Sequence, residues 1–130
     1  MSAAWSEVDP FDLPEWLGVE RVTWSPDEGL AGGLVLGALT SEDSGEQLPC
    51  DLLAADLAHP VPVVAESVRV EVHRAWSRDE VLLASRDGRL TVAAPGTEPS
   101  VDQVLEMLRR LAKALGASPE RFAARLFLRR

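Results

Sequence analysis

The dipeptide Asp87-Gly88 separates two short runs of β-forming residues, and it constrains the fold more than any other part of the sequence. A type I′ turn needs a positive φ at both central positions, and Asp-Gly is among the pairs that best tolerate it. Residues 81–86 and 89–94 are therefore predicted to form a β-hairpin. Arg86 and Arg89 would face each other beside its turn.

Three earlier segments are also predicted to be extended. Residues 19–24 alternate moderately, residues 34–39 form a short apolar run, and residues 46–57 form a second run beyond a glycine-containing loop. Two such runs around a short loop indicate a second hairpin. Pro49 lacks a backbone N–H, which indicates an edge position or a strand start at that point.

Residues 67–73 show the clearest alternation in the chain. Three valines at positions 68, 70 and 72 alternate with Arg69, Glu71 and His73. A period of two is typical of a strand with one buried and one solvated face. This segment is predicted to be a half-buried strand.

Helices are predicted mainly after the last strand. Ser100 and Gln103 have the spacing of a capping box, and apolar residues then recur at helical spacing through residues 101–115. Ser118 and Pro119 could begin a last helix that runs to residue 128. A short helix over residues 13–17 is also expected, since Asp12 and Glu15 have capping-box spacing there.

These elements predict one α+β domain over residues 1–130. It would contain an antiparallel sheet of about five strands with two C-terminal helices packed on one face. Residues 1–18 would form an N-terminal aromatic and acidic strap, residues 19–95 would be mostly β, and residues 100–130 would be helical. A chain of 130 residues with 46% hydrophobic residues can bury the core that such a fold needs.

Composition also bears on where the protein works. Cys50 is the only cysteine, the start of the chain has no basic segment typical of a secretory signal, and no apolar run approaches the length of a membrane span. A cytoplasmic protein is therefore expected. Isoleucine, asparagine and tyrosine are absent and arginine far outnumbers lysine, which indicates a bacterium with a GC-rich genome.

The net charge of −8 is unevenly distributed. Residues 1–60 contain twelve acidic residues and one base, whereas residues 61–130 contain nine acidic and twelve basic residues. An acidic total disfavours association with nucleic acid or an anionic membrane. The split would allow the two halves to attract each other, with the acids of the strap facing the C-terminal arginines.

No catalytic, nucleotide or metal motif stands out. Cys50 has no adjacent base, and the histidines His59 and His73 lack further ligands at metal spacing. The glycines at positions 29–37 fit no phosphate-binding pattern. No cofactor and no metal are expected. An enzyme or small-ligand site could still be assembled from dispersed residues such as Cys50, Asp51, His59, Arg69 and His73.

Two features could serve contact with a partner. Trp5, Phe11 and Trp16 lie among acidic residues and prolines, so they could either cover the protein's own core or dock into a basic groove. Arg121, Arg125 and Arg129 would share one face of the predicted last helix, which could cover the core or bind a partner.

We therefore expect a small, non-catalytic protein that acts through protein–protein contact as an adaptor, chaperone-like or regulatory protein. Its partner would be another protein or a second copy in a homodimer. The site residues predicted for this role are Trp5, Phe11, Trp16, Arg121, Arg125 and Arg129. The alternatives are the dispersed ligand or enzyme site, and a nucleic-acid-associated regulator that uses the three arginines.

Overall fold

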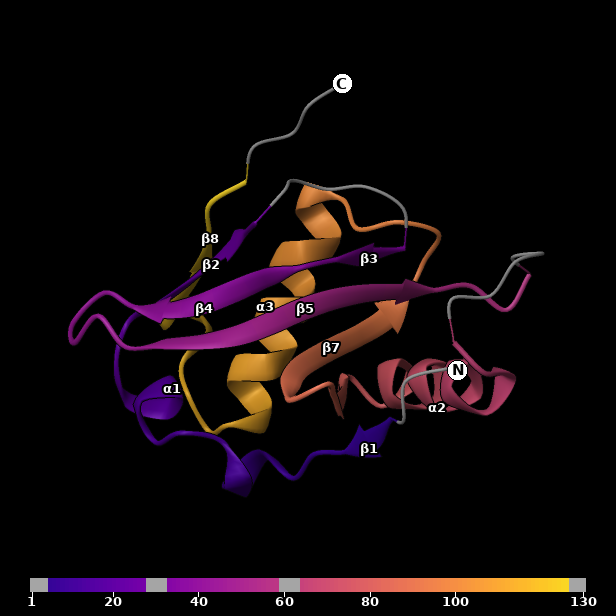
Figure 1. Ribbon diagram of the computed structural model, residues 1–130, viewed down its shortest axis with the longest axis horizontal. Coiled ribbons are helices and arrows are strands. Elements are labelled where there is room, and N and C mark those ends of the chain that lie inside the picture. Colours follow the sequence, from indigo (N-terminus) through magenta and orange to yellow (C-terminus); the bar gives the residue numbers. More distant parts are fainter. Residues whose placement is uncertain (1–4, 28–32, 59–63, 127–130) are drawn as a thin grey trace.

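Strand β5 (Gln47–Ala55) lies at the centre of one mixed sheet, to which the rest of the chain attaches (Figure 1). The computed structural model describes residues 5–27, 33–58 and 64–126. The other strands are β1 (Ser6–Glu7), β2 (Val22–Pro26), β3 (Leu34–Val35), β4 (Gly37–Ser41), β6 (Leu82–Arg86), β7 (Arg89–Pro95) and β8 (Phe122–Ala124). The helical segments are the 3-10 turns η1 (Pro10–Asp12) and η2 (Pro119–Arg121) and the α-helices α1 (Trp16–Val19), α2 (Glu66–Ser77) and α3 (Val101–Ala114).

The sheet has eight strands in the order β1-β6-β7-β5-β4-β2-β8, with β3 also paired to β5. Most neighbours are antiparallel, but β5 runs parallel to β7 and β2 runs parallel to β8. The α+β class is therefore confirmed. The expectation of a purely antiparallel sheet of about five strands is wrong, because α2 and β6 lie between β5 and β7 in the chain and return it in the same direction.

The hairpin predicted at Asp87-Gly88 is confirmed. Arg86 pairs with Arg89, and the two turn residues have φ of 53° and 76°. Pro49 is in a singly paired part of β5, because the pairing of β5 with β7 begins only at Cys50. Its missing N–H therefore removes no bond to β7, in agreement with the edge position expected from the sequence.

The two long helices, α2 and α3, cover opposite faces of the sheet, so the expectation of two C-terminal helices packed on one face is wrong. Leu52 and Val92 pack in the same cluster as Leu108 of α3, whereas their neighbours Leu53 and Ala93 pack with α2. Successive strand residues point to opposite faces, so the helices lie on either side. The predicted N-cap of α3 is confirmed, because the Ser100 hydroxyl accepts a hydrogen bond from the Gln103 N–H at 3.2 Å. The second bond of a capping box is not formed, since the Gln103 side-chain amide donates to the carbonyl of Pro95 instead.

Residues 66–77 form α2, so the strand predicted over residues 67–73 is wrong. Val68 and Val72 are four residues apart and lie on one helical face that packs on Leu53 and Ala93. Val70, the third valine of the alternation, is half-buried. The pattern fitted both periods, and packing against the sheet favours the helix.

The predicted helix over residues 119–128 is also wrong. Ser118 and Pro119 begin only one 3-10 turn, after which Phe122–Ala124 pairs with β2 and buries Phe122. Pairing satisfies the backbone groups at the edge of β2, and it continues where the Arg125 N–H donates to the carbonyl of Trp24 at 2.8 Å. Residues 127–130 lie outside the described residues.

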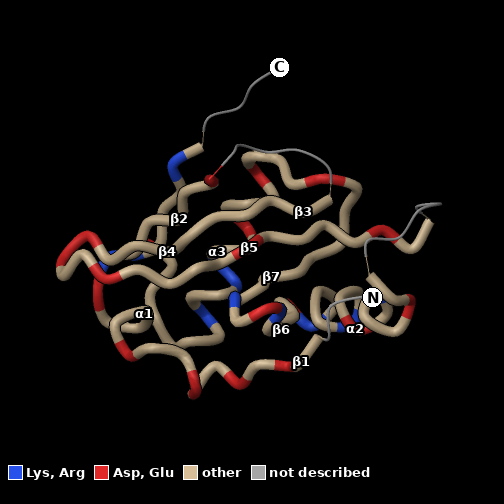
Figure 2. The backbone as a smooth tube through the Cα atoms, in the orientation of Figure 1, with Lys and Arg blue, Asp and Glu red and all other residues tan. Residues whose placement is uncertain are grey.

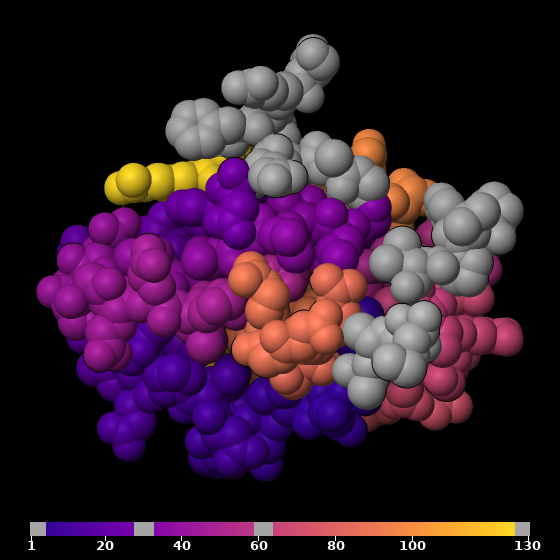
Figure 3. Space-filling view, viewed as in Figure 1, coloured from indigo at the N-terminus to yellow at the C-terminus, as the bar shows by residue number. Residues whose placement is uncertain are grey.

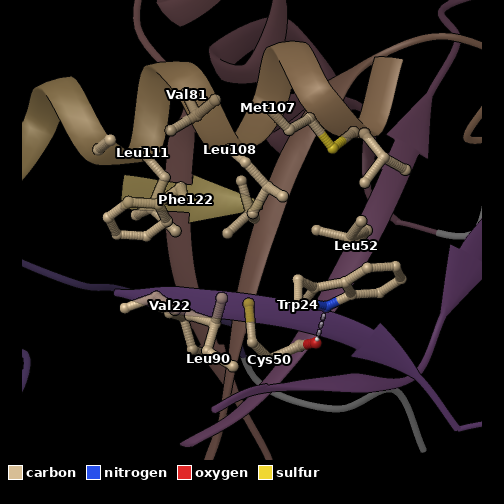
Figure 4. Close-up of a cluster of buried hydrophobic side chains, with 14 of the residues drawn as sticks. Val22, Trp24, Cys50, Leu52, Val81, Leu90, Met107, Leu108, Leu111 and Phe122 are labelled. Carbon is tan, nitrogen blue, oxygen red and sulfur yellow. Dashed lines mark hydrogen bonds between the residues drawn. The ribbon is translucent and has the colours of Figure 1, made fainter. Parts of the chain in front are cut away.

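Trp24 anchors the core between the sheet and α3 (Figure 4). Its side chain is fully buried, and its indole Nε1–H donates to the carbonyl of Cys50 at 2.9 Å. Gly37 leaves the room that the ring needs, since a Cβ at this position would lie 2.7 Å from the Trp24 side chain. The glycine in β4 thus leaves space for the tryptophan of the neighbouring strand β2.

Candidate protein-binding site

Phe11 is held in a defined position and yet points into solvent. Its side chain is 96% exposed, the most exposed of the large hydrophobic residues that the structure describes. Asp9 caps the turn η1 by accepting a hydrogen bond from the Phe11 N–H at 2.9 Å, and Pro10 and Pro14 restrict the backbone on either side. The segment presents an aromatic ring with little backbone freedom left to lose. The helix expected over residues 13–17 begins later, as α1, and its N-cap Glu15 makes no side-chain capping hydrogen bond, so the expected cap by Asp12 does not form.

A shallow groove of about 330 Å³ adjoins Phe11. We call it the Phe11 groove, and its lining residues are Pro10, Phe11, Leu13, Pro14, Glu15, Gly18, Val19 and Leu115. The helix α1 rests closely on the end of α3, because a Cβ at Gly18 would lie 3.3 Å from the carbonyl oxygen of Leu115. Val19, another lining residue, is 65% exposed. The groove is mostly apolar and can accept an apolar side chain.

The strap that forms most of this groove is acidic, and Glu15 lines the groove itself. The described part of the strap, residues 5–18, forms the lower margin of the molecule in Figure 3 and carries four acidic residues and no base (Figure 2). Within the described ranges, none of the four forms an ion pair. The ion pairs that do join the two halves of the chain use Asp27, Glu42 and Asp51 instead. The acids expected to face the C-terminal arginines therefore face solvent.

The two tryptophans of the strap differ from Phe11. Trp5 packs partly against the hydrophobic residues between α2 and the sheet, and the guanidinium carbon of Arg86 lies 5.6 Å from its ring centroid. Trp16 packs partly against the core beneath α3. Neither lines the Phe11 groove. The strap thus covers part of the core with its tryptophans and displays its phenylalanine.

The arginines predicted to share a helical face are separated. Arg121 ends the turn η2, and its guanidinium donates to the carbonyl of Val19 at the rim of the Phe11 groove. Arg125 follows β8 and lies 3.8 Å from a carboxylate oxygen of Glu42. Arg129 lies outside the described residues. Of the two predicted arginines that the structure describes, Arg121 therefore lies at the rim of the groove.

The residues considered for a dispersed site do not form one in the described part of the chain. Cys50 is fully buried in the core, and burial raises the pKa of its thiol, which keeps it protonated. Arg69 and His73 are on α2, where Arg69 donates to the carbonyls of Asp56 and Leu57. His59 lies outside the described residues. None of the hollows described here is lined by any of these side chains.

Asp51 is instead the buried half of an ion pair that the sequence reading missed. Its side chain has no exposed surface, and it binds Arg89 through Nε at 3.0–3.1 Å and Nη2 at 2.8 Å. Arg89 also donates to the carbonyl of Gly37 at 3.0 Å, and its hydrogen bond to Asp51 raises its own pKa. The sequence did contain one sign of this ion pair, because Asp51 stands inside an otherwise apolar strand and a buried carboxylate needs a partner.

A larger hollow of about 530 Å³ lies where β1, α2 and α3 meet. Its charged lining contains both signs: Glu7, Glu71, Arg78, Asp79, Glu80, Arg110 and Lys113. Most of the polar groups at its α3 wall already have partners, because Asp79 binds Arg109 at 2.7 Å and Lys113 at 2.8 Å. Arg110 stacks on Trp76, with 3.6 Å from its guanidinium carbon to the ring centroid. This wall therefore fastens α3 to the end of α2.

No cluster of three or more potential metal ligands occurs among the described residues. Nor does any helix in the described ranges have the length and apolarity required to traverse a bilayer. Comparisons with protein-family models, curated proteins and solved structures found no match for this chain.

Proposed function

We propose that this protein acts in the bacterial cytoplasm, without catalysis of its own, by binding another protein through the Phe11 groove. The observation that carries the proposal is the 96% exposure of Phe11 beside an apolar groove. Burying a phenylalanine side chain contributes about 1.5–3 kcal/mol relative to leaving it in water. A partner that covers the Phe11 ring would gain this free energy on binding. Aromatic residues dominate the energetics of many interfaces for this reason.

Rigidity of the site supports the same proposal. Asp9, Pro10 and Pro14 fix the turn before any partner arrives, so little conformational entropy remains to be lost on binding. Arg121 contributes a guanidinium at the rim. Trp5, Trp16 and Arg125 do not line the groove, and in this proposal they hold or flank the elements that build it.

The state of the polar core residues argues in the same direction. The Cys50 thiol is buried and protonated, and the Asp51 carboxylate is engaged by Arg89. Neither group is free to act as a nucleophile or as a base. Binding therefore accounts for the exposed features better than catalysis does.

The test compares three tagged forms of the chain: wild type, Phe11→Ala, and Leu105→Ala as a matched control. Leu105 is 46% exposed on α3 and does not line the groove. Proteins retained from source cells would be quantified by mass spectrometry. We expect at least one specific partner to be lost with Phe11→Ala and kept with Leu105→Ala. Equal retention by all three forms would contradict the proposed function.

A further inference from the structure

We propose that the occupant of the Phe11 groove is a basic segment of another protein, in which an apolar side chain is flanked by lysine or arginine. This inference rests on the proposed function and specifies the chemistry of its partner. An apolar anchor follows from the groove, whose walls are formed mainly by proline, leucine, valine and the exposed phenylalanine. The lysine or arginine on either side of this anchor follows from the negative charge around the groove.

The carboxylates nearest the groove are available to a partner. Asp12 and Glu15 are exposed, and neither side chain makes a hydrogen bond or an ion pair with another described residue. Asp9 is exposed and uses one oxygen on the Phe11 N–H. Three negative charges therefore lie within four residues of Phe11, against the single charge of Arg121 at the rim.

The C-terminal end of α3 adds to the negative electrostatic potential at the groove. Leu115, the C-cap of α3, lines the groove. The last carbonyls of a helix carry partial negative charge, which favours a cation nearby. Lys113, the base in the last turn, is bound to Asp79 at 2.8 Å and is already engaged there. The helix end and the strap therefore both favour a positively charged partner.

The same charge argues against a second copy of the chain as the occupant. A symmetric dimer places one patch against itself, so the carboxylates of the two strap segments would meet at one interface. Like charges in contact oppose association, whereas lysine or arginine in a partner would complement them and speed its encounter with the groove.

Fluorescence anisotropy with three labelled peptides tests the inference. The first peptide has a leucine flanked by lysine and arginine, the second has glycine in place of the leucine, and the third keeps the leucine but has glutamate flanks. We expect the first to bind at least about tenfold more tightly than either of the others. Equal binding of the first and third peptides, or no binding of the first, would overturn the inference.

Variants of the protein separate this inference from the proposed function. Phe11→Ala should weaken the first peptide and the cellular partner by about 10–100-fold, whereas Leu105→Ala should leave both unchanged. The double variant Asp12→Asn/Glu15→Gln should weaken both about three- to tenfold, an effect that salt reproduces. Both substitutions remove charge from exposed side chains that make no hydrogen bond or ion pair with another described residue, so we expect the fold to be retained.

Each combination of these binding results supports or refutes a different proposal. If the cellular partner depends on Phe11 but ignores the charge variant and salt, the binding function stands and the basic partner is refuted. If light scattering shows a dimer that Phe11→Ala dissociates, the occupant is a second copy and the inference is again refuted. If Phe11→Ala changes no binding, the proposed function itself fails.

Discussion

Arg89 links three strands of the sheet through its backbone and its side chain. Its guanidinium binds Asp51 of β5 and the carbonyl of Gly37 in β4, while its backbone belongs to β7. The Gly37 N–H also donates to Asp51 at 3.3 Å. A charge inside a protein is tolerated only when its partners are in place, so this ion pair specifies the relative positions of these strands.

We predict that Arg89→Leu lowers the free energy of unfolding by about 3–5 kcal/mol, because it leaves the Asp51 carboxylate buried without its partner. Adding Asp51→Leu should recover part of this loss, since the buried charge is then removed as well. Urea denaturation gives both values. Arg74→Leu is the control: it breaks the exposed ion pair with Glu71 and should cost less than about 1 kcal/mol.

Gly37 is a second residue at which a small change, the addition of a Cβ atom, should lower the stability of the fold. We predict that Gly37→Ala destabilises the protein by about 1–3 kcal/mol or more, because its Cβ would meet the Trp24 ring at 2.7 Å and the Ser25 carbonyl at 2.6 Å. Urea denaturation and the fluorescence of the buried tryptophan would report the change. Thr40→Ala, on the same strand, should cost less. Equal stability of Gly37→Ala and wild type would show that the ring can move aside.

At the scale of elements, the end of α2 is fastened to α3 by charge. Hydrogen bonds from Lys113 and then Arg109 lower the pKa of Asp79 from 3.8 to about 2, and a hydrogen bond from Arg109 lowers the pKa of Glu106 from 4.5 to about 2. Folded-state pKa values below the unfolded ones mean that these carboxylates stabilise the fold when ionised. That contribution is present above about pH 4.5 and is lost as the pH falls toward 2.

We therefore predict that the urea midpoint of the wild type falls between about pH 4.5 and 2, and that Asp79→Asn/Glu106→Gln reduces this fall. The variant should be less stable than wild type at pH 7 and approach it near pH 2. Asparagine tolerates the positive φ of 62° at position 79, so the backbone is preserved. Glu71→Gln is the control. A variant as stable as wild type at neutral pH would contradict the network's role.

Elements with local signals could be predicted from the sequence, and those decided by distant partners could not. The hairpin at Asp87-Gly88 and the helix after Ser100 depend on turn and cap chemistry that acts over a few residues. The valines of α2 fitted two periods, and only the face of β5 and β7 decides between them. Residues 122–124 form a strand because the edge of β2 is available to them.

The candidate site shows the same division. Sequence reasoning singled out Phe11 with two tryptophans, but only the fold separates the exposed ring from the two that pack inward. It placed three arginines on a helix that does not form, because it could not see the pairing of β8 with β2. The Asp51–Arg89 pair joins residues far apart in the chain, and spacing along a sequence carries no sign of such contacts.

Over the whole molecule, stability should decrease from the centre of the sheet to its edges. Leu52 and Leu53 pair with β3 on one side and β7 on the other, whereas β1 and β8 contain two and three residues at the two edges. We predict that amide hydrogen exchange is slowest in β5 and β7 and fastest in β1 and β8. Exchange in β8 as slow as that in β5 would contradict this order.

The parallel pairing of β2 with β8 has a consequence for biosynthesis. Val22 leaves the ribosome well before Phe122, which lies opposite it in the finished sheet. The nascent polypeptide therefore keeps the apolar flank around Trp24 uncovered while the residues between these two strands are translated. A stalled product that stops before residue 122 would expose this flank to neighbouring polypeptides and to proteases.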